Sequence, residues 1–190
     1  RSIVEVYDAG EDQGMPWMAM ELLDGEPLTA RLERLGPMQP AECVLAACEI
    51  LSGLGAVHAE GIIHRDLKPD NIFLEHDADG STQPKILDFG IAKLSQSPQK
   101  LTKAGAVIGT AYYLAPEQAA GVADIDARVD IYAMGVMMFE ALSGCMPFDG
   151  RSLTELLRKL ATEPPLQLQT AAPHLPPSLC KVIHRCLERE

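Results

Sequence analysis

The chain of 190 residues has no lysine before Lys68 and no Cys-x-x-Cys pair. Its five cysteines, at positions 43, 48, 145, 180 and 186, are odd in number and irregularly spaced, which does not suggest a disulfide framework. Buried thiols in a reducing compartment are the simpler interpretation. The best metal candidate is the trio of Cys180, His184 and Cys186, but only the first two share a helical face, so the pattern for a metal site is weak.

Long apolar runs and basic residues are also scarce. The most apolar stretch, residues 131–144, is shorter than the roughly 20 residues of a membrane-spanning helix and contains Glu140. It predicts a buried core helix, and we expect no signal peptide or membrane segment within the chain, while an anchor outside it stays open. With 16 basic and 27 acidic residues, the net charge is −11, which argues against nucleic-acid binding.

The remaining composition, 47% hydrophobic, supports a globular core. Residues 3–23 are typical of a strand, a turn and a second strand. Apolar spacing predicts helices, and two short apolar runs around a polar segment predict a small hairpin at 71–89. Residues 89–121 show no clear period and are expected to form a long ordered loop, a feature that usually marks function. The predicted helices cover residues 28–36, 40–61, 125–144, 152–162 (with Ser152 as N-cap) and 177–190, the last still running at the end of the chain.

The chemistry is concentrated in "HRDLKPDN", residues 64–71. Asp66 can accept a proton from a hydroxyl, Lys68 can neutralise a transferring phosphoryl group, and Asn71 is an oxygen ligand of the kind that Mg²⁺ accepts. Asp88, in "LDFG", offers a second oxygen ligand. An acid, a cation and two metal ligands suit phosphoryl transfer, although each residue alone is equally typical of a turn or a solvated surface.

In combination the motifs are specific. "HRDLKPDN" is followed by "DFG" and then by "APE" at 115–117, which is the order of the protein-kinase signature. The chain therefore resembles the eukaryotic-like (Hanks-type) Ser/Thr protein kinases, most closely their bacterial members, over essentially its whole length. The resemblance implies an α+β kinase fold in which residues 1–23 are small-lobe strands and the hinge, and residues 24–190 are the large lobe.

The resemblance also implies a function. It is the ATP-dependent phosphorylation of Ser or Thr on protein substrates, with ATP and Mg²⁺ as cofactors and Mn²⁺ as an alternative metal. A lysine two residues after the catalytic aspartate is the Ser/Thr pattern in this family. A cytoplasmic location, either free or as part of a membrane-anchored protein, and dimerisation for autophosphorylation are further expectations.

Roles follow from the resemblance position by position. Asp66 is implied as the catalytic base, Lys68 as a γ-phosphate contact, and Asn71 and Asp88 as metal ligands, with Thr110 bonding Asp66 and Lys68. For the nucleotide the implied residues are Met20 as gatekeeper, Glu21 and Leu23 through their backbone, and Phe73 beneath the adenine; plain core packing is as good an interpretation of Met20 and Phe73.

Further implied residues support the site. Asp130 ties down the catalytic-loop backbone, although an acid in the first turn of a helix is favourable in any case. Thr102 is implied as an activating phosphosite read by Arg65 and Lys93, with an unmodified threonine on a mobile loop as the alternative. The other implied structural residues are His64, Phe89 and Glu117.

The family pattern is incomplete. Residues 1–67 contain no ATP-anchoring lysine, no glycine-rich loop and no glutamate to pair with that lysine; "GLGAVH" at Gly53–His58 lies inside a predicted helix. The arginine that pairs with Glu117 in the family is expected beyond the last residue. We therefore expect a kinase domain truncated at both ends and inactive in isolation. Alternatives are a pseudokinase or non-catalytic module and a small-molecule kinase, although "GTAYYLAPE" at 109–117 favours a protein substrate.

Overall fold

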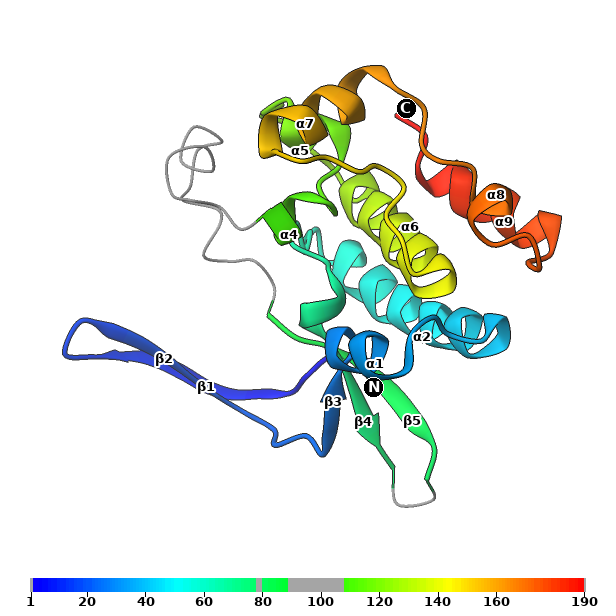
Figure 1. The fold of residues 1–190 in the computed structure, drawn as a ribbon. Coiled ribbons are helices and arrows are strands. Elements are labelled where there is room, and N and C mark those ends of the chain that lie inside the picture. Colours follow the sequence, from blue (N-terminus) through cyan, green and yellow to red (C-terminus); the bar gives the residue numbers. More distant parts are fainter. Residues whose placement is uncertain (1, 78–79, 89–107, 190) are drawn as a thin grey trace.

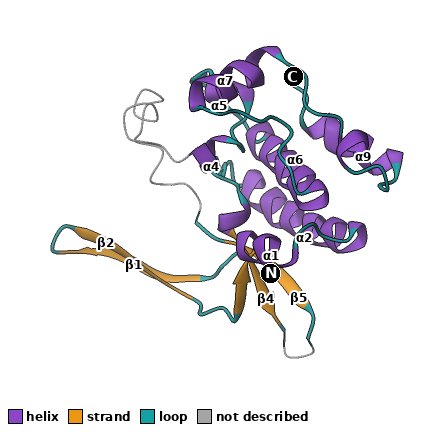
Figure 2. Ribbon diagram, viewed as in Figure 1, coloured by secondary structure: helices purple, strands orange, loops and turns teal. Residues whose placement is uncertain are grey.

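The computed structural model describes residues 2–77, 80–88 and 108–189. A helical body carries a three-stranded sheet at one end, and a long two-stranded hairpin projects from it (Figures 1 and 2). The hairpin consists of β1 (Val6–Asp12) and β2 (Met15–Met20), paired antiparallel, and every one of these residues is exposed. Gln13 and Gly14, both with positive φ, form its turn. The predicted strand, turn and strand are confirmed.

The second sheet has the order β3–β4–β5 and is antiparallel throughout. The strands β4 (Ile72–His76) and β5 (Thr82–Ile86) form the predicted small hairpin. The sequence analysis missed β3 (Gly25–Pro27), which pairs with β4. Gly25 makes this pairing feasible, because a Cβ built there would lie 2.0 Å from the carbonyl oxygen of Leu74.

The bounds of the long helices lie close to the ranges predicted from the apolar spacing. The N-cap of α7 is confirmed, since the Ser152 hydroxyl accepts a hydrogen bond from the Glu155 backbone N–H at 3.2 Å. Helix α9 ends at Cys186 instead of running to residue 190, so that part of the prediction was wrong. The principal helices are α1 (Leu28–Leu35), α2 (Pro40–Ala59), α6 (Arg128–Ser143), α7 (Leu153–Thr162) and α9 (Pro177–Cys186).

Short helices occupy segments where no period was visible. The expected loop of residues 89–121 contains α4 (Ile108–Ala111) and α5 (Pro116–Ala119) in its described part. The proline-rich link before α9 contains α8 (Leu168–Ala171), and a 3₁₀ turn, η1 (Pro69–Asn71), follows the catalytic motif. Such elements are too short to produce a readable periodicity.

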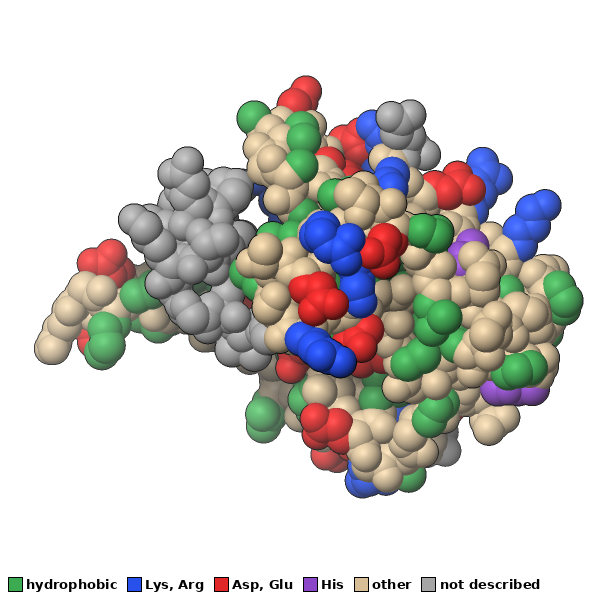
Figure 3. Space-filling view, turned by 45° about the horizontal axis from the view of Figure 1, so that its top comes forward, with side chains coloured by type: hydrophobic (Ala, Val, Ile, Leu, Met, Phe, Trp, Pro, Cys, Tyr) green, Lys and Arg blue, Asp and Glu red, His purple; other side chains and the backbone are tan. Residues whose placement is uncertain are grey.

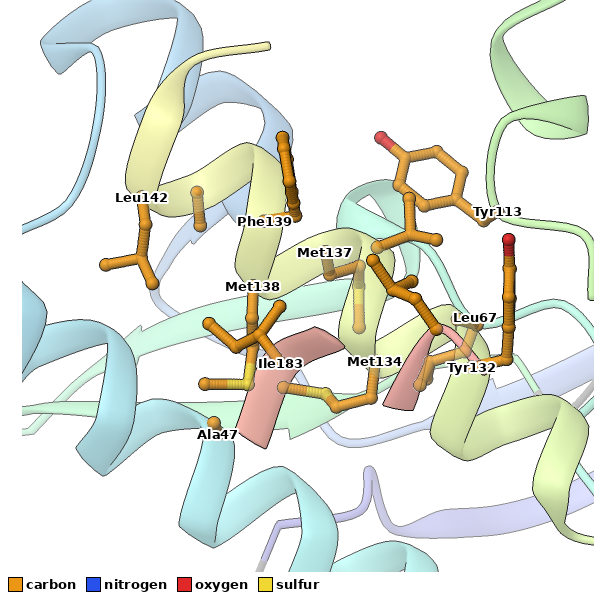
Figure 4. Packing of buried hydrophobic residues seen from close by; sticks show 14 of the residues in the cluster. Ala47, Leu67, Tyr113, Tyr132, Met134, Met137, Met138, Phe139, Leu142 and Ile183 are labelled. Carbon is orange, nitrogen blue, oxygen red and sulfur yellow. The ribbon is translucent and has the colours of Figure 1, made fainter. Parts of the chain in front are cut away.

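Helix α6 is the centre of the core, lying between α2 and α9 (Figure 1). Figure 4 shows Met138 of α6 near Ile183 of α9 and Ala47 of α2. These three side chains and that of Phe139 are buried. Gly135 permits the close approach of α9, because a Cβ at this position would lie 2.7 Å from the Cβ of Cys186. The predicted buried core helix is confirmed.

Among the described residues one helix, α2, is long and apolar enough to cross a membrane by length and composition. The sequence analysis had singled out a shorter run, in α6. One side of α2 carries the core residues Cys43, Ala47, Ile50 and Leu54. This side packs against α6 and β5, and 28% of the most apolar window of the helix is buried. The expectation of no membrane segment stays a prediction.

Candidate active site

The loop between α2 and β4 is anchored by one buried carboxylate. Asp130, in the first turn of α6, is 1% exposed. Its Oδ2 accepts the backbone N–H of His64 at 2.9 Å, and its Oδ1 accepts that of Arg65 at 2.8 Å. The ring of His58, from the end of α2, contacts the same Oδ2 at 2.8 Å. Three segments are thereby joined at Asp130. The two bonds to the loop backbone are those that the resemblance implied, while the contact with His58 was not predicted.

His64 links this loop to the strand end before Asp88. Its side chain is fully buried. The Asp66 N–H lies 3.3 Å from Nδ1, so Nδ1 acts as the acceptor and the proton resides on Nε2. Nε2 then donates to the carbonyl oxygen of Leu87 at 3.0 Å, while the Leu87 N–H donates to the Asn71 carbonyl at 2.8 Å. The backbone on both sides of Asp66 is thus fixed relative to the segment that carries Asp88.

Asp66, Lys68 and Thr110 lie together. The ammonium of Lys68 is 3.7 Å from Oδ2 of Asp66 and donates to the hydroxyl of Thr110 at 3.3 Å. The side chains of Asp66 and Lys68 retain 15% and 18% of their exposure, so both can reach a bound substrate. Thr110 comes from α4, more than 40 residues away in sequence. The structure therefore places an acid, a cation and a hydroxyl from a distant segment at one point.

Asn71 and Asp88 have the donor chemistry of a divalent-cation site. The amide nitrogen of Asn71 donates to the Asp66 carbonyl at 2.8 Å, which turns the amide oxygen away from that carbonyl. Asp88 is exposed, two residues after the end of β5. Hard oxygen ligands of this type fit Mg²⁺, whose sites are usually completed by substrate phosphates. Within the described ranges no group of three or more His, Cys, Asp or Glu side chains could hold a metal ion.

In the predicted hinge after β2, the side chain of Glu21 bonds to two other segments. The carboxylate of Glu21 accepts the backbone N–H of Glu5 at 2.9 Å and the ammonium of Lys85 at 2.7 Å. The hydrogen bond to Lys85 lowers the pKa of Glu21. Lys85 lies on β5 and also contacts Glu75 at 3.4 Å. The sequence analysis missed Lys85, although its place between Pro84 and Ile86, two buried residues of a strand, marks it as a charge on the opposite face.

The other predicted nucleotide-contacting residues flank this hinge. Met20, at the end of β2, is 39% exposed. Leu23 is half-buried, and Phe73 is half-buried on β4 opposite Pro27. Their exposure leaves apolar surface beside the hinge backbone, as a planar aromatic ligand requires.

Several predicted residues are not brought to this site. Phe89, Lys93 and Thr102 lie outside the described residues, so their roles stay predictions. Glu117 lines a separate cavity of about 310 Å³ together with Tyr132, Arg185 and Arg189. In the part of the chain that the structure describes, no ion pair joins its carboxylate. The predicted structural role of Glu117 stays a prediction.

The weak metal candidate near the end of the chain is not supported by the geometry. Nε2 of His184 accepts a hydrogen bond from the Leu168 backbone N–H at 3.0 Å. Cys180 is buried, and burial raises the pKa of its thiol. The His184 nitrogen is therefore occupied by a hydrogen bond, and the Cys180 thiol is buried in the core, so neither side chain is available as a metal ligand in this structure.

Comparison with known proteins identifies the family. The protein kinase domain family matches residues 1–190. Among curated proteins, the Ser/Thr-protein kinase pkn2 of Myxococcus xanthus is 40% identical over 193 residues, covering 100% of this chain and 23% of that protein. PknL of Mycobacterium tuberculosis is 40% identical over 152 residues, 80% of this chain and 37% of that protein. PkaA of Streptomyces coelicolor is 37% identical over 99% of this chain and 33% of that protein.

Among solved structures, that of Rad53 1–466 in complex with AMP-PNP is similar with a TM-score of 0.79 and 26% identity. The match covers 100% of this chain and 46% of that one. The chain thus spans less than half the length of each of these proteins, from 23% to 46%. The resemblance to bacterial Ser/Thr protein kinases is confirmed: the chain belongs to the protein kinase domain family.

Proposed function

We propose that this chain is the large lobe and hinge of a protein kinase that transfers the γ-phosphoryl group of ATP to Ser or Thr hydroxyls of protein substrates. One observation carries the proposal: Asp66 and Lys68 lie on a loop held by Asp130, and Thr110 of α4 contacts Lys68 there. It is supported by the relatives, which are named Ser/Thr protein kinases, and by the nucleotide analogue in the Rad53 complex. No observation on the described residues favours a pseudokinase.

Positioning and charge neutralisation supply most of the catalysis in such a reaction. The carboxylate of Asp66 accepts the proton of the substrate hydroxyl while the oxygen of that hydroxyl forms a bond to the γ-phosphorus. The bond from that phosphorus to the bridging oxygen breaks, and ADP leaves. The ammonium of Lys68 donates hydrogen bonds to the transferring group, and the Thr110 hydroxyl keeps Lys68 in place.

Asn71 and Asp88 would hold a divalent cation, and we propose Mg²⁺, with Mn²⁺ as the alternative. When bound, the cation neutralises phosphate charge. At the hinge, the Glu21 carbonyl and the Leu23 N–H would bond the adenine, and Met20 and Phe73 would contact its faces. A cytoplasmic location, dimerisation and phosphorylation of Thr102 stay predictions.

The test is the variant Asp66→Asn, made in the chain expressed with any sequence that flanks it in its gene. The amide keeps the size of the side chain but cannot accept the proton. We expect ATP-dependent phosphorylation of a Ser/Thr protein substrate to fall by about 10²- to 10⁴-fold, because general-base catalysis is lost. Nucleotide affinity should change little.

A matched control is Asp149→Asn, the same chemical change at an exposed residue. It should retain full turnover. Equal turnover of Asp66→Asn and wild type would remove Asp66 from the mechanism, and a wild-type protein without ATP-dependent transfer would contradict the proposed function itself.

A further inference from the structure

Gln118, in the short helix α5, joins two segments that both belong to the candidate site. Its side-chain oxygen accepts the backbone N–H of Ala115 at 3.1 Å. Its side-chain nitrogen donates to the backbone carbonyl of Arg65 at 3.0 Å. Ala115 is fully buried and follows the stretch that begins with Thr110. One amide therefore bonds the segment expected to dock the substrate and the residue immediately before Asp66.

The backbone at Arg65 explains why this bond matters. Arg65 has φ +66°, a left-handed conformation that is uncommon for a residue with a side chain and costs about 1 kcal/mol or more. Such a conformation persists only where its surroundings hold it. Asp130 accepts the N–H of Arg65 on one side, and Gln118 donates to its carbonyl on the other.

The carbonyl of Arg65 belongs to the peptide group that also contains the N–H of Asp66. A peptide group is planar, so rotating this carbonyl moves the Asp66 N–H, which bonds to His64. The position of the Asp66 carboxylate therefore depends on the bond from Gln118. Because Gln118 is bonded to Ala115 as well, a shift of the 110–117 segment is transmitted to Asp66.

The amide of Gln118 matches both partners. Ala115 offers a donor and Arg65 offers an acceptor, so the side chain must accept from one and donate to the other. A glutamate accepts but cannot donate when ionised, and a methionine of similar length does neither effectively.

We propose that Gln118 is a positioning residue that couples the placement of the substrate-docking segment to that of Asp66. Its side chain acts through Arg65. The inference rests on the function proposed above, and it predicts an effect on transfer to the substrate rather than on binding of the nucleotide.

The experiment compares Gln118→Glu and Gln118→Met with wild type, in the chain expressed with its flanking sequence. The kcat is expressed per nucleotide-binding site, counted by titration with AMP-PNP, so that unfolded protein is not counted. We expect both variants to lose about 10- to 100-fold in kcat, the size of effect that a misplacement of about 1 Å produces. The Kd for AMP-PNP should stay within about twofold.

Gln169→Glu is the matched control. The amide of Gln169 also donates to backbone carbonyls, those of Pro173 and Leu175, but it lies apart from the site. This variant loses the same kind of bond and should keep the wild-type kcat per site. An equal loss of kcat in the Gln118 and Gln169 variants would overturn the positioning role.

Hydrogen exchange separates this inference from the proposed function. In Gln118→Met the amides of residues 64–67 and Ala115 should exchange faster than in wild type, whether or not the protein phosphorylates anything. Unchanged exchange at both segments contradicts the coupling, while absence of transfer in wild type contradicts only the function.

Discussion

Asp130 shows how much of this site depends on a single side chain. It is an acid 99% removed from solvent, and it accepts two backbone N–H groups and contacts the ring of His58. Burial of a carboxylate is unfavourable unless hydrogen bonds compensate for it. The bonds at Asp130 hold Arg65 in its left-handed conformation, so the residue contributes to stability and to the geometry of Asp66 together.

Asp130→Ala should therefore destabilise the fold. Each backbone N–H left buried without a partner costs about 1–3 kcal/mol. With two such groups, we expect the free energy of unfolding to fall by at least about 2 kcal/mol, measured by urea denaturation. Asp149→Ala removes an exposed acid and should change it by less than about 0.5 kcal/mol. Similar losses in the two variants would show that the buried bonds of Asp130 contribute nothing.

At the scale of elements, α8 and α9 are joined by a histidine that must be neutral. Nε2 of His184 accepts the Leu168 N–H at 3.0 Å, and the ring packs edge-on against Phe139 of α6, with ring centroids 6.3 Å apart. Burial lowers the pKa of His184 below its usual value of 6.5. The folded state thus binds fewer protons at this residue than the unfolded state does below about pH 6.5.

The sign of the pH dependence follows. A histidine with a lowered folded pKa stabilises the fold fully above its unfolded pKa, and that contribution is lost as the pH falls through 6.5 toward the folded pKa. We expect Tm to drop between about pH 7 and pH 5.5 in wild type, and less in His184→Gln, whose amide oxygen can still accept from Leu168. If Tm fell with pH equally in the two proteins, His184 would be excluded as the source of the pH dependence.

At the scale of the whole molecule, the two sheets differ in environment. The β1–β2 hairpin exposes Tyr7 by 64% and Met15 by 70%, while β4 and β5 place Ile72 and Ile86 in the core. Figure 3 shows both hydrophobic and acidic side chains on the projecting hairpin, and acidic and basic side chains that adjoin one another on the body. At the end of β2 and just after it, Met20 and Leu22 are also exposed, by 39% and 98%.

This arrangement predicts weak activity for the polypeptide of residues 1–190 by itself. In the function proposed above, the residues present would contact an adenine from the hinge side, and residues 1–67 contain no lysine to align the phosphates. A misplacement of about 1 Å costs roughly 100-fold in rate. We expect phosphorylation of a Ser/Thr substrate by residues 1–190 to be at least about 100-fold slower than by the chain joined to its flanking sequence. Equal rates would show that residues 1–190 bind and align the nucleotide well enough without further sequence.

The sequence by itself determined the family and the long helices, and it predicted the candidate site residues. These features depend on local chemistry: Asp66, Lys68 and Asn71 lie within six residues of one another, and the apolar period of residues 125–144 is a property of one helix. The helix ends at Gly36 and Gly144 were equally readable, because both have positive φ, which glycine favours.

The tertiary structure alone decided how these parts are held together. The bond from Gln118 to Arg65 joins residues 53 apart, and that from Lys85 to Glu21 joins residues 64 apart. Neither pair has a local pattern, because each bond exists only once the chain has folded and brought the groups within hydrogen-bond distance. The same reason explains β3, whose three residues form a strand through their pairing with β4 and not through their own propensity.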